Sequence, residues 1–500
     1  MSLTSHSDFS QTKTPLLETL WECANKTHSA FYTPGHKRGK GISPRLATYF
    51  GKGVFRFDLP ELTPLDNLFS PTGSIQSAQA LASQAFGALH TWFLINGSTC
   101  GIEAAILATC GSGEKTILSR NAHSSAISGL ILAGAVPIFV NPEYDPVLDI
   151  TYSITPQGLS DALELHPEAK AVMIVYPTYY GVCGDINAIA KITHDYNIPL
   201  LVDEAHGAHF AFHQQFPITA LSADADLAVQ STHKVLGAMT QASMLHIQGD
   251  RIDRDRVNKA LQLLQSTSPS YLLLASLDAA RQQMAIHGEE LMSHTLQLAK
   301  QAKIRVNQIP KLSLLEVPDP PSLGFAALDQ TRLTVNVAKL GLTGFTAEEI
   351  LDKQLGIICE FASIKNLTFI ISLGNTQEDI NHLVEALSTL AQEYWQPTGQ
   401  DSISYSCQYP IPKGVSNSML VLPREAFFSS TEILPIDSER ICERICAEVI
   451  CPYPPGIPIL VPGELISYEA LIYLQQIKQM GGFISGCADT SANTIKVVKS

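Results

Sequence analysis

Short apolar segments alternate with longer amphipathic stretches over residues 91–248. Several of the short segments are apolar at every position, as strands covered by helices on both faces must be. The alternation therefore predicts an α/β fold with a doubly wound, mostly parallel sheet of seven strands. The expected strands are 91–96, 115–119, 136–140, 171–176, 199–203, 227–231 and 242–247.

The pattern changes beyond this region. After a helical stretch over about 251–302, residues 313–316 and 332–337 are expected to form strands, and residues 347–355 and 376–395 helices. A polar, turn-rich linker over 396–408 then leads into a last unit. We predict four parts: an N-terminal arm over 1–30, a large domain over 31–295, a small α+β domain over 296–396 and a C-terminal α+β domain over 397–500.

Composition narrows the class of protein. Charged residues make up 16% of the chain, against a usual share of about 25%, so we expect surface hidden between the subunits of a homo-oligomer. The net charge of −14 argues against nucleic acid or an acidic membrane as partner, and it is compatible with a small cationic substrate. Residues 1–14 are polar and no apolar run reaches membrane-spanning length, so we expect a cytoplasmic protein without membrane contact.

The ten cysteines lack the density and regular spacing of a secreted disulfide scaffold. Cys442, Cys446, Cys451 and Cys487 gather near the C-terminus and raise the question of a metal site. However, Cys442 and Cys446 fall on a stretch with helical spacing, and the chain contains no CxxC motif. We therefore expect no metal.

An aspartate and a lysine lie where two strands of the predicted sheet end. Asp203 ends the strand 199–203, and Lys234 follows the strand 227–231. Open α/β sheets bind ligands at this edge, and a buried lysine loses its proton readily and becomes a nucleophile. Taken singly, Asp203 can instead cap a turn, and Lys234 can instead pair with a carboxylate. Together they match pyridoxal 5'-phosphate (PLP), which needs a Schiff-base lysine and an acidic partner for its pyridinium nitrogen.

A small-residue turn follows the first predicted strand and opens the helix 102–109. It contains Ser98, Thr99 and Cys100. A helix start offers free N–H groups and a positive dipole end to a phosphate, although the same residues also form ordinary helix caps. Ser231 is expected to add a donor from across the site.

Two histidines lie close to the same edge. His123 follows the strand 115–119, where it can stack on a cofactor ring or cap the next helix. His233 directly precedes Lys234 and offers a further hydrogen-bond donor.

These segments, in this order and spacing, resemble the aspartate aminotransferase-like superfamily of PLP enzymes, fold type I. Finer motifs resemble the bacterial ornithine/lysine/arginine decarboxylase family over about residues 30–470. The resemblance implies the short form of the family, without the receiver-like domain of its large members, and a dimer with active sites at the subunit interface. The motifs are Tyr32-Thr33-Pro34-Gly35-His36-Lys37, the run 58–68, Ser231-Thr232-His233-Lys234, and 452–458 followed by Pro462-Gly463-Glu464.

The resemblance assigns roles to individual residues. Lys234 is expected to hold PLP, Asp203 to pair with its ring nitrogen, Ala205 to pack under the ring and His123 to stack above it. The remaining cofactor contacts that we expect are Ser98, Thr99, Cys100, Thr178, His206, Ser231 and His233.

The reaction implied is loss of the α-carboxylate from a basic amino acid. Arginine, giving agmatine and CO2 for polyamine biosynthesis, is the favoured substrate, with lysine and ornithine as alternatives. Glu464 and Asp66 are candidate partners for the distal cation, because a buried cation needs a carboxylate; both also suit surface caps. Either Lys234 or His233 would return the proton to Cα.

Two other classes of function stay open from the residues alone. A PLP aminotransferase or carbon–sulfur lyase would need the same strand-end residues. A non-catalytic protein that has kept the fold is disfavoured because Lys234 and Asp203 are both present.

Overall fold

The computed structural model describes residues 10–394, 419–453 and 456–499. A seven-stranded sheet forms the centre of the protein, with the strand order β1-β10-β9-β8-β6-β2-β3. Five strands from β9 to β3 run parallel, whereas β10 is antiparallel to both β9 and β1. The predicted fold class and all seven strands are confirmed, with ends within two residues. The strands are β1 (His90–Leu94), β2 (Lys115–Ser119), β3 (Val136–Val140), β6 (Val172–Val175), β8 (Leu200–Asp203), β9 (Leu227–Gln230) and β10 (Ser243–Ile247).

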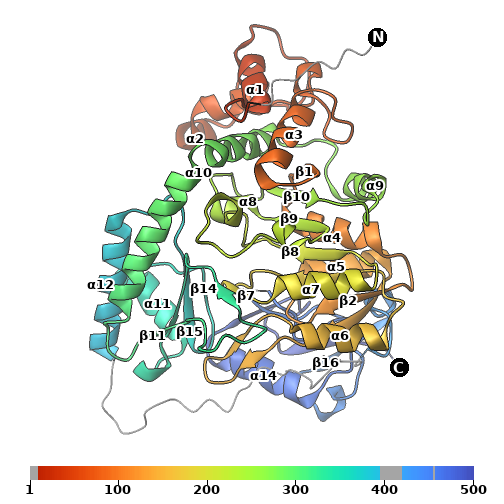
Figure 1. Cartoon of the computed structure of the whole chain (residues 1–500), viewed down its shortest axis with the longest axis vertical. Helices are drawn as coiled ribbons and strands as arrows, with labels where there is room; N and C mark the ends of the chain where they lie inside the picture. Colours follow the sequence, from red (N-terminus) through yellow and green to blue (C-terminus); the bar gives the residue numbers. More distant parts are fainter. Residues whose placement is uncertain (1–9, 395–418, 454–455, 500) are drawn as a thin grey trace.

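Helices cover both faces of this sheet, as Figure 1 shows. On β8, Leu201 packs into the cluster formed with one set of helices, while Leu200 and Val202 pack into the other. This alternation follows from the two-residue period of a strand. One layer contains α4 (Gly97–Thr109), α5 (Ser124–Ala133) and α9 (Arg254–Leu264); the other contains α3 (Ser74–Phe86), α6 (Pro156–Leu165) and α7 (Ile186–Asp195).

A glycine sets how closely α4 approaches the sheet. A Cβ atom on Gly101 would lie 2.7 Å from side-chain atoms of both Leu94 on β1 and Val229 on β9. Only glycine therefore lets this helix lie directly against the strands. Close packing here fixes the start of α4 beside the end of β9.

A second, four-stranded antiparallel sheet forms the small domain, in the order β11-β13-β15-β14. Helix α10 (Tyr271–Val306) connects the two cores, because its first half packs against the large sheet and its last turns against the small one. The small domain contains β11 (Ser313–Leu314), β13 (Arg332–Asn336), β14 (Phe361–Ala362), β15 (Asn366–Ile370), α11 (Gly344–Leu355) and α12 (Gln377–Tyr394).

The C-terminal unit lies below the large sheet in Figure 1. It contains two antiparallel strand pairs, β16 (Thr431–Pro435) with β19 (Thr494–Val498) and β17 (Cys451–Tyr453) with β18 (Phe483–Ser485), and the helices α13 (Pro423–Phe428) and α14 (Tyr468–Gln479). Arg424 on α13 donates to the backbone carbonyl of Leu132 at 2.8 Å, which ties this unit to α5. The predicted linker over 396–408 lies outside the described residues.

The expected helix around Cys442 and Cys446 is wrong. A single 3-10 turn, Glu439–Ile441, ends before Cys442, and Cys446 forms a β-bridge with Val497. Pairing with β19 overrides the helical spacing of this segment, as tertiary contacts commonly do. Among the described residues, no group of three or more His, Cys, Asp or Glu side chains is arranged to hold a metal ion.

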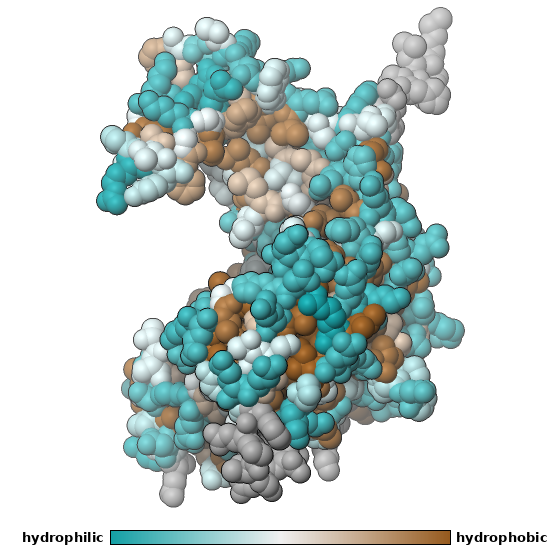
Figure 2. Space-filling model, turned by 90° about the vertical axis from the view of Figure 1, so that its left-hand side faces the viewer, coloured by the Kyte–Doolittle hydropathy of each residue, from teal (hydrophilic) through white to brown (hydrophobic). Residues whose placement is uncertain are grey.

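The N-terminal lobe at the top of Figure 1 holds two helices with different surroundings. Helix α1 (Pro15–Asn25) buries Leu16 and Leu20 against α10 and α3, whereas α2 (Pro44–Phe57) buries no side chain. Tyr49 and Phe50 of α2 are 74% and 65% exposed. Figure 2 shows a deep hollow beneath this lobe, with hydrophobic side chains gathered along its inner side. None of the described helices combines the length and apolarity needed to cross a membrane.

Candidate active site

Lys234 lies at the carboxyl edge of the large sheet, in a short helix, α8 (Thr232–Val235), that directly follows β9. Its Nζ atom is 3.1 Å from Nε2 of His206. Burial lowers the pKa of Lys234, and the neighbouring Asp203 opposes that shift in part. A lysine in this setting gives up its proton more readily than one in water.

Asp203 ends the neighbouring strand β8 and is 8% exposed. Burial raises the pKa of its carboxyl group, while Lys234 and the N–H of Ala205 lower it. That N–H donates to Oδ1 at 3.1 Å, so Asp203 does cap a turn, as one interpretation of the sequence proposed. The same carboxyl group also lies within electrostatic reach of Lys234. A cationic ring bound beside it would favour its ionised form.

His206 connects Lys234 to a buried arginine that the sequence did not single out. Nη2 of Arg332, on β13, donates to Nδ1 of His206 at 2.8 Å. Because Nδ1 accepts, the proton of the neutral imidazole lies on Nε2, which faces Lys234. Burial holds the pKa of His206 well below its ordinary value, so the ring is neutral. Nε2–H can donate only to a lysine nitrogen with a free lone pair, so the network favours the neutral amine of Lys234.

The guanidinium group of Arg332 has N–H groups that donate no hydrogen bond to the described residues. Arg332 is 1% exposed, and its Nε and Nη1 atoms make no hydrogen bond with the described residues. Its aspartate neighbour, Asp329, lies 3.7 Å from Nε and also pairs with His209 at 3.2 Å. Buried donors without partners are rare in native proteins and commonly mark a place for a ligand or water. In the sequence, Arg332 was only the first residue of an expected strand, because its contact with His206 joins segments 126 residues apart.

Several open hydrogen-bonding groups gather where α4 begins. The N-cap residue of this helix, Asn96, makes no capping hydrogen bond, so Ser98 and Thr99 lie in a first turn without a side-chain cap. Ser231 donates to Oγ of Ser98 at 2.7 Å and so joins the end of β9 to this turn. Thr232 Oγ1 is buried and makes no hydrogen bond with the described residues. The group has the character of an anion site at a helix start.

The two predicted histidines are both neutral near pH 7. His123 accepts a hydrogen bond from the N–H of Ser125 at 3.2 Å and thus caps α5, while burial, with Lys234 adding to it, lowers the pKa of His123 to about 4. His233 donates through Nδ1 to the carbonyl of Ala242 at 3.0 Å, and burial lowers its pKa as well. The capping interpretation of His123 is therefore correct, and its stacking on a cofactor stays a prediction.

Other predicted site residues make contacts within their own segments. Thr178 Oγ1 accepts from the N–H of Val182 at 3.2 Å in a buried turn. The Cys100 thiol donates to the carbonyl of Gly97 at 3.1 Å, and burial raises its pKa to about 12. Ala205 is buried directly after the strand-end carboxylates. Their contacts with a cofactor stay predictions.

The two candidate partners for a substrate's distal cation are engaged inside the chain. Glu464 pairs with Arg120 at 3.2 Å where the C-terminal unit meets the large domain. Asp66 accepts hydrogen bonds from several backbone N–H groups between residues 67 and 76, the shortest from Gly73 at 2.7 Å, and so closes the loop before α3. Their role in substrate binding stays a prediction.

Comparison with solved structures defines the class of fold. The chain superimposes on lysine decarboxylase A from Pseudomonas aeruginosa with a TM-score of 0.82 and 24% sequence identity, over 97% of this chain and 80% of that one. At this identity the likeness shows the fold, which is that of the fold type I enzymes expected from the sequence.

Sequence comparison defines the family. The family models described as the major domain and the C-terminal domain of Orn/Lys/Arg decarboxylases match residues 14–379 and 415–488. The chain is 39% identical to an arginine decarboxylase of Bacillus subtilis (strain 168), over 98% of this chain and 99% of the relative. It is 38% identical to an arginine decarboxylase of Halalkalibacterium halodurans, over 98% of each. The chain belongs to the Orn/Lys/Arg decarboxylase family.

Proposed function

We propose that this decarboxylase acts on L-arginine and releases agmatine and CO2, with PLP as its cofactor. The observation that carries the proposal is the network Arg332–His206–Lys234, which links a lysine whose pKa is lowered by burial to a buried guanidinium at the sheet edge. The choice of arginine rests on likeness to arginine decarboxylases at 38–39% identity over nearly the whole chain.

The residues at the sheet edge fit PLP. We assign its covalent attachment to Lys234 and the partner of its ring nitrogen to Asp203. Its phosphate suits the uncapped start of α4, together with Ser231 and the unpartnered hydroxyl of Thr232. His123 and Ala205 would lie on the two faces of its ring. When bound, PLP supplies an electron sink for the electrons of the bond to the departing carboxylate.

Residues of the chain itself would orient the substrate and supply the proton. Nε and Nη1 of Arg332 make no hydrogen bond with the described residues and could donate to the α-carboxylate of the amino acid, because guanidinium groups bind carboxylates in a fixed geometry. This contact would orient the bond that breaks. His206 keeps Lys234 as a free base, and Lys234 can afterwards carry a proton to Cα. His233 is the alternative donor, since it lies directly before Lys234.

We further propose that the protein is a homodimer in the cytoplasm. The amphipathic helix α2 buries none of its side chains, and Phe31 before it is 95% exposed, so this lobe has an apolar face that a second copy would cover. The lobe that carries this face overhangs the hollow in Figure 2. The nine described cysteines are all free thiols, which suits a reducing compartment.

Release of CO2 from separate substrates tests the proposed function. The PLP-loaded protein is offered arginine, lysine and ornithine, and CO2 is measured for wild type, Lys234→Ala and Lys303→Ala. Lys303 is a matched control because burial also lowers its pKa, to about 8. We expect arginine to be preferred by about tenfold or more in kcat/KM, which corresponds to about 1.4 kcal/mol. Lys234→Ala should release none, whereas Lys303→Ala should keep its activity.

Two outcomes would overturn parts of this proposal. Preference for lysine or ornithine would keep the reaction and replace the substrate. No CO2 from any of the three amino acids would refute decarboxylation by this chain.

A further inference from the structure

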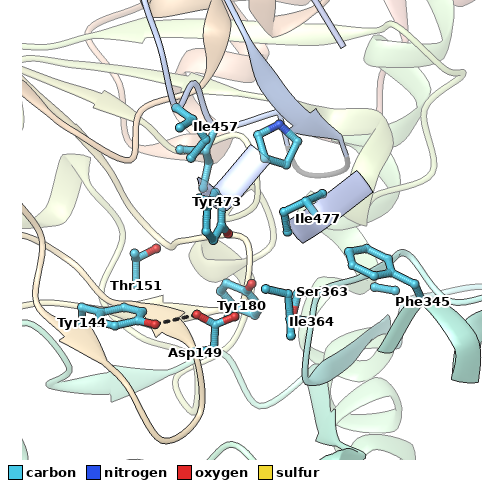
Figure 3. A pocket seen from close by; sticks show the side chains of 13 residues that line it. Tyr144, Asp149, Thr151, Tyr180, Phe345, Ser363, Ile364, Ile457, Tyr473 and Ile477 are labelled. Atoms are coloured by element: carbon cyan, nitrogen blue, oxygen red, sulfur yellow. Dashed lines mark hydrogen bonds between the residues drawn. The ribbon is translucent and has the colours of Figure 1, made fainter. Parts of the chain in front are cut away.

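A cavity that Lys234 does not line is found where three parts of the protein meet. Its walls come from the hairpin of β4 (Tyr144–Asp145) and β5 (Ile150–Thr151), from the start of α11 and the end of β14 in the small domain, and from α14 with Pro452, Ile457 and Ile459 of the C-terminal unit. Figure 3 shows these side chains around one space. The empty volume of this space, counted together with its open mouth, is about 550 Å³.

A buried carboxylate forms the floor of this cavity. Asp149 is 8% exposed, and its Oδ1 accepts a hydrogen bond from the hydroxyl of Tyr144 at 2.6 Å (Figure 3). Its other oxygen accepts no hydrogen bond from the described residues. Burial raises the pKa of Asp149, and the hydrogen bond from Tyr144 and the charge of Lys365 oppose that shift only in part. Lys365 is not a wall of the cavity, and its Nζ donates to the carbonyls of Pro146 and Val147 at 3.1 and 3.0 Å.

The other walls are aromatic and aliphatic. Tyr473 projects from α14 towards Tyr180 and the floor, while Ile457 and Ile477 line the upper side (Figure 3). Among the described residues, no Lys, Arg or His side chain lines this space. Aromatic faces and a buried carboxylate attract an organic cation. A carboxylate on the ligand would find no cation here to receive it.

We propose that this cavity, called here the Asp149 cavity, binds an aliphatic ammonium or guanidinium ion that lacks a carboxylate, and that binding lowers the rate of decarboxylation. Under the proposed function on which this inference rests, the amine product is such an ion and the amino acid is not. Binding of the product in the cavity would then lower the rate of decarboxylation at the active site as the product accumulates.

One segment forms both the cavity wall and the surroundings of Lys234. Tyr180 lines the cavity, and the ring of the preceding Tyr179 meets the ring of His206 edge-on with centroids 5.3 Å apart. The following residue, Gly181, has φ +83°, and a Cβ there would lie 2.6 Å from Cγ of Arg332. Because the residues on both sides of Tyr180 are closely packed, a ligand that displaces Tyr180 must also disturb His206 or Arg332. The expected effect is a lower kcat at saturating substrate.

Inhibition by agmatine tests the Asp149 cavity in the PLP-loaded enzyme. Asp149→Asn removes the charge, keeps an acceptor for Tyr144 and tolerates the positive φ of 57°. Asp145→Asn is the matched control, because Asp145 lies on the same hairpin but does not line the cavity. We expect agmatine to lower the kcat of wild type and Asp145→Asn, and to do so about tenfold less potently in Asp149→Asn. Without agmatine, all three should have the same kcat and KM.

Purely competitive inhibition, or equal inhibition of Asp149→Asn and wild type, would overturn this proposal. Calorimetric titration of the same proteins with agmatine measures binding to the cavity and does not require turnover. We expect two sites per chain in wild type and Asp145→Asn, and one in Asp149→Asn. If no amino acid releases CO2 but the second site still depends on Asp149, the proposed function fails and the cation site stands. Equal site numbers in all three proteins would refute the cation site.

Discussion

Two buried arginines form the same type of ion pair in two regions of this protein, but their remaining hydrogen-bond donors are used differently. Arg281 and Arg332 are 0% and 1% exposed, and each pairs with an aspartate three residues earlier. Arg281 donates through its terminal nitrogens to the carbonyl of Gln11 at 2.9 Å, to that of Lys13 at 2.7 Å and to Asp278, leaving only Nε unpaired. Arg332 donates to His206, while its Nε and Nη1 atoms make no hydrogen bond with the described residues.

We interpret the difference as one between a structural and a functional buried charge. Asp278 accepts from the N–H of Leu16, so with Arg281 it fastens the N-terminal segment to α10. Arg332 instead donates to His206, and its charge lies within electrostatic reach of Lys234 in the predicted cofactor site. A buried donor without a partner costs free energy. We infer that this cost is retained at Arg332 because a substrate carboxylate offsets it.

The largest effect is expected when the structural pair is broken. Arg281→Leu leaves Asp278 buried without its cation, which should lower the free energy of unfolding by about 3–5 kcal/mol. Urea unfolding at a fixed protein concentration measures this loss. A loss below about 1 kcal/mol would mean that the pair does not hold the N-terminal segment, and the comparison with Arg332 would fail.

Glu204 extends the comparison to a buried carboxylate without an arginine. It accepts from the N–H of Ala220 at 2.7 Å and from Gln230 at 2.8 Å, and burial raises its pKa from 4.5 to about 7. The fold therefore favours the protonated group, and stability falls as pH rises from about 4.5 to about 7. Glu204→Gln should reduce the difference in unfolding free energy between about pH 5 and pH 8 by about 2–3 kcal/mol. An unchanged difference would show that Glu204 is ionised at little cost.

Arg332→Gln should act mainly on substrate binding. Loss of the contact to the α-carboxylate is expected to cost about 2 kcal/mol, or roughly a thirtyfold rise in KM with a smaller change in kcat. Stability should fall less than in Arg281→Leu, because Asp329 keeps its contacts with His209 and Thr331. Steady-state kinetics measures the effect on KM, and urea unfolding measures the effect on stability. A variant with wild-type KM would show that Arg332 does not receive the carboxylate.

The smallest effect concerns the unpartnered hydroxyl of Thr232. Thr232→Val keeps the shape and removes a buried group that makes no hydrogen bond within the described chain. The dissociation constant for PLP should rise about tenfold, equivalent to about 1.4 kcal/mol, while the cofactor-free protein melts no earlier. Fluorescence titration with PLP and thermal melting measure the two quantities. Unchanged affinity together with earlier melting would make Thr232 a packing residue.

Patterns along single strands allowed most of the fold to be predicted. The seven strands of the large sheet were expected because their apolar runs are local signals, and Asp203 and Lys234 followed from the position of strand ends. The role of Arg332 was missed, because its link to His206 depends on how the small domain packs on the large one. Two-residue strands such as β4 and β5, which bring Asp149 into its cavity, are too short for a periodic pattern.

The predicted start of α4 shows a similar limit. Residues 102–109 were expected to be helical, but the helix begins at Gly97. Glycine and two hydroxyl residues are poor helix formers in isolation. The close packing allowed by Gly101 draws this turn into the helix and places Ser98 beside Ser231.

Attachment of PLP to Lys234 can be measured directly. Borohydride reduction of the PLP-loaded protein makes the link between lysine and cofactor permanent, and peptide mass spectrometry then locates the modified residue. We predict the label on the peptide that contains Lys234 and none on Lys303, although burial lowers the pKa of Lys303 to about 8. A label on Lys303 or another lysine, or no label in protein that has bound PLP, would contradict the assignment of the active site to the carboxyl edge of the large sheet.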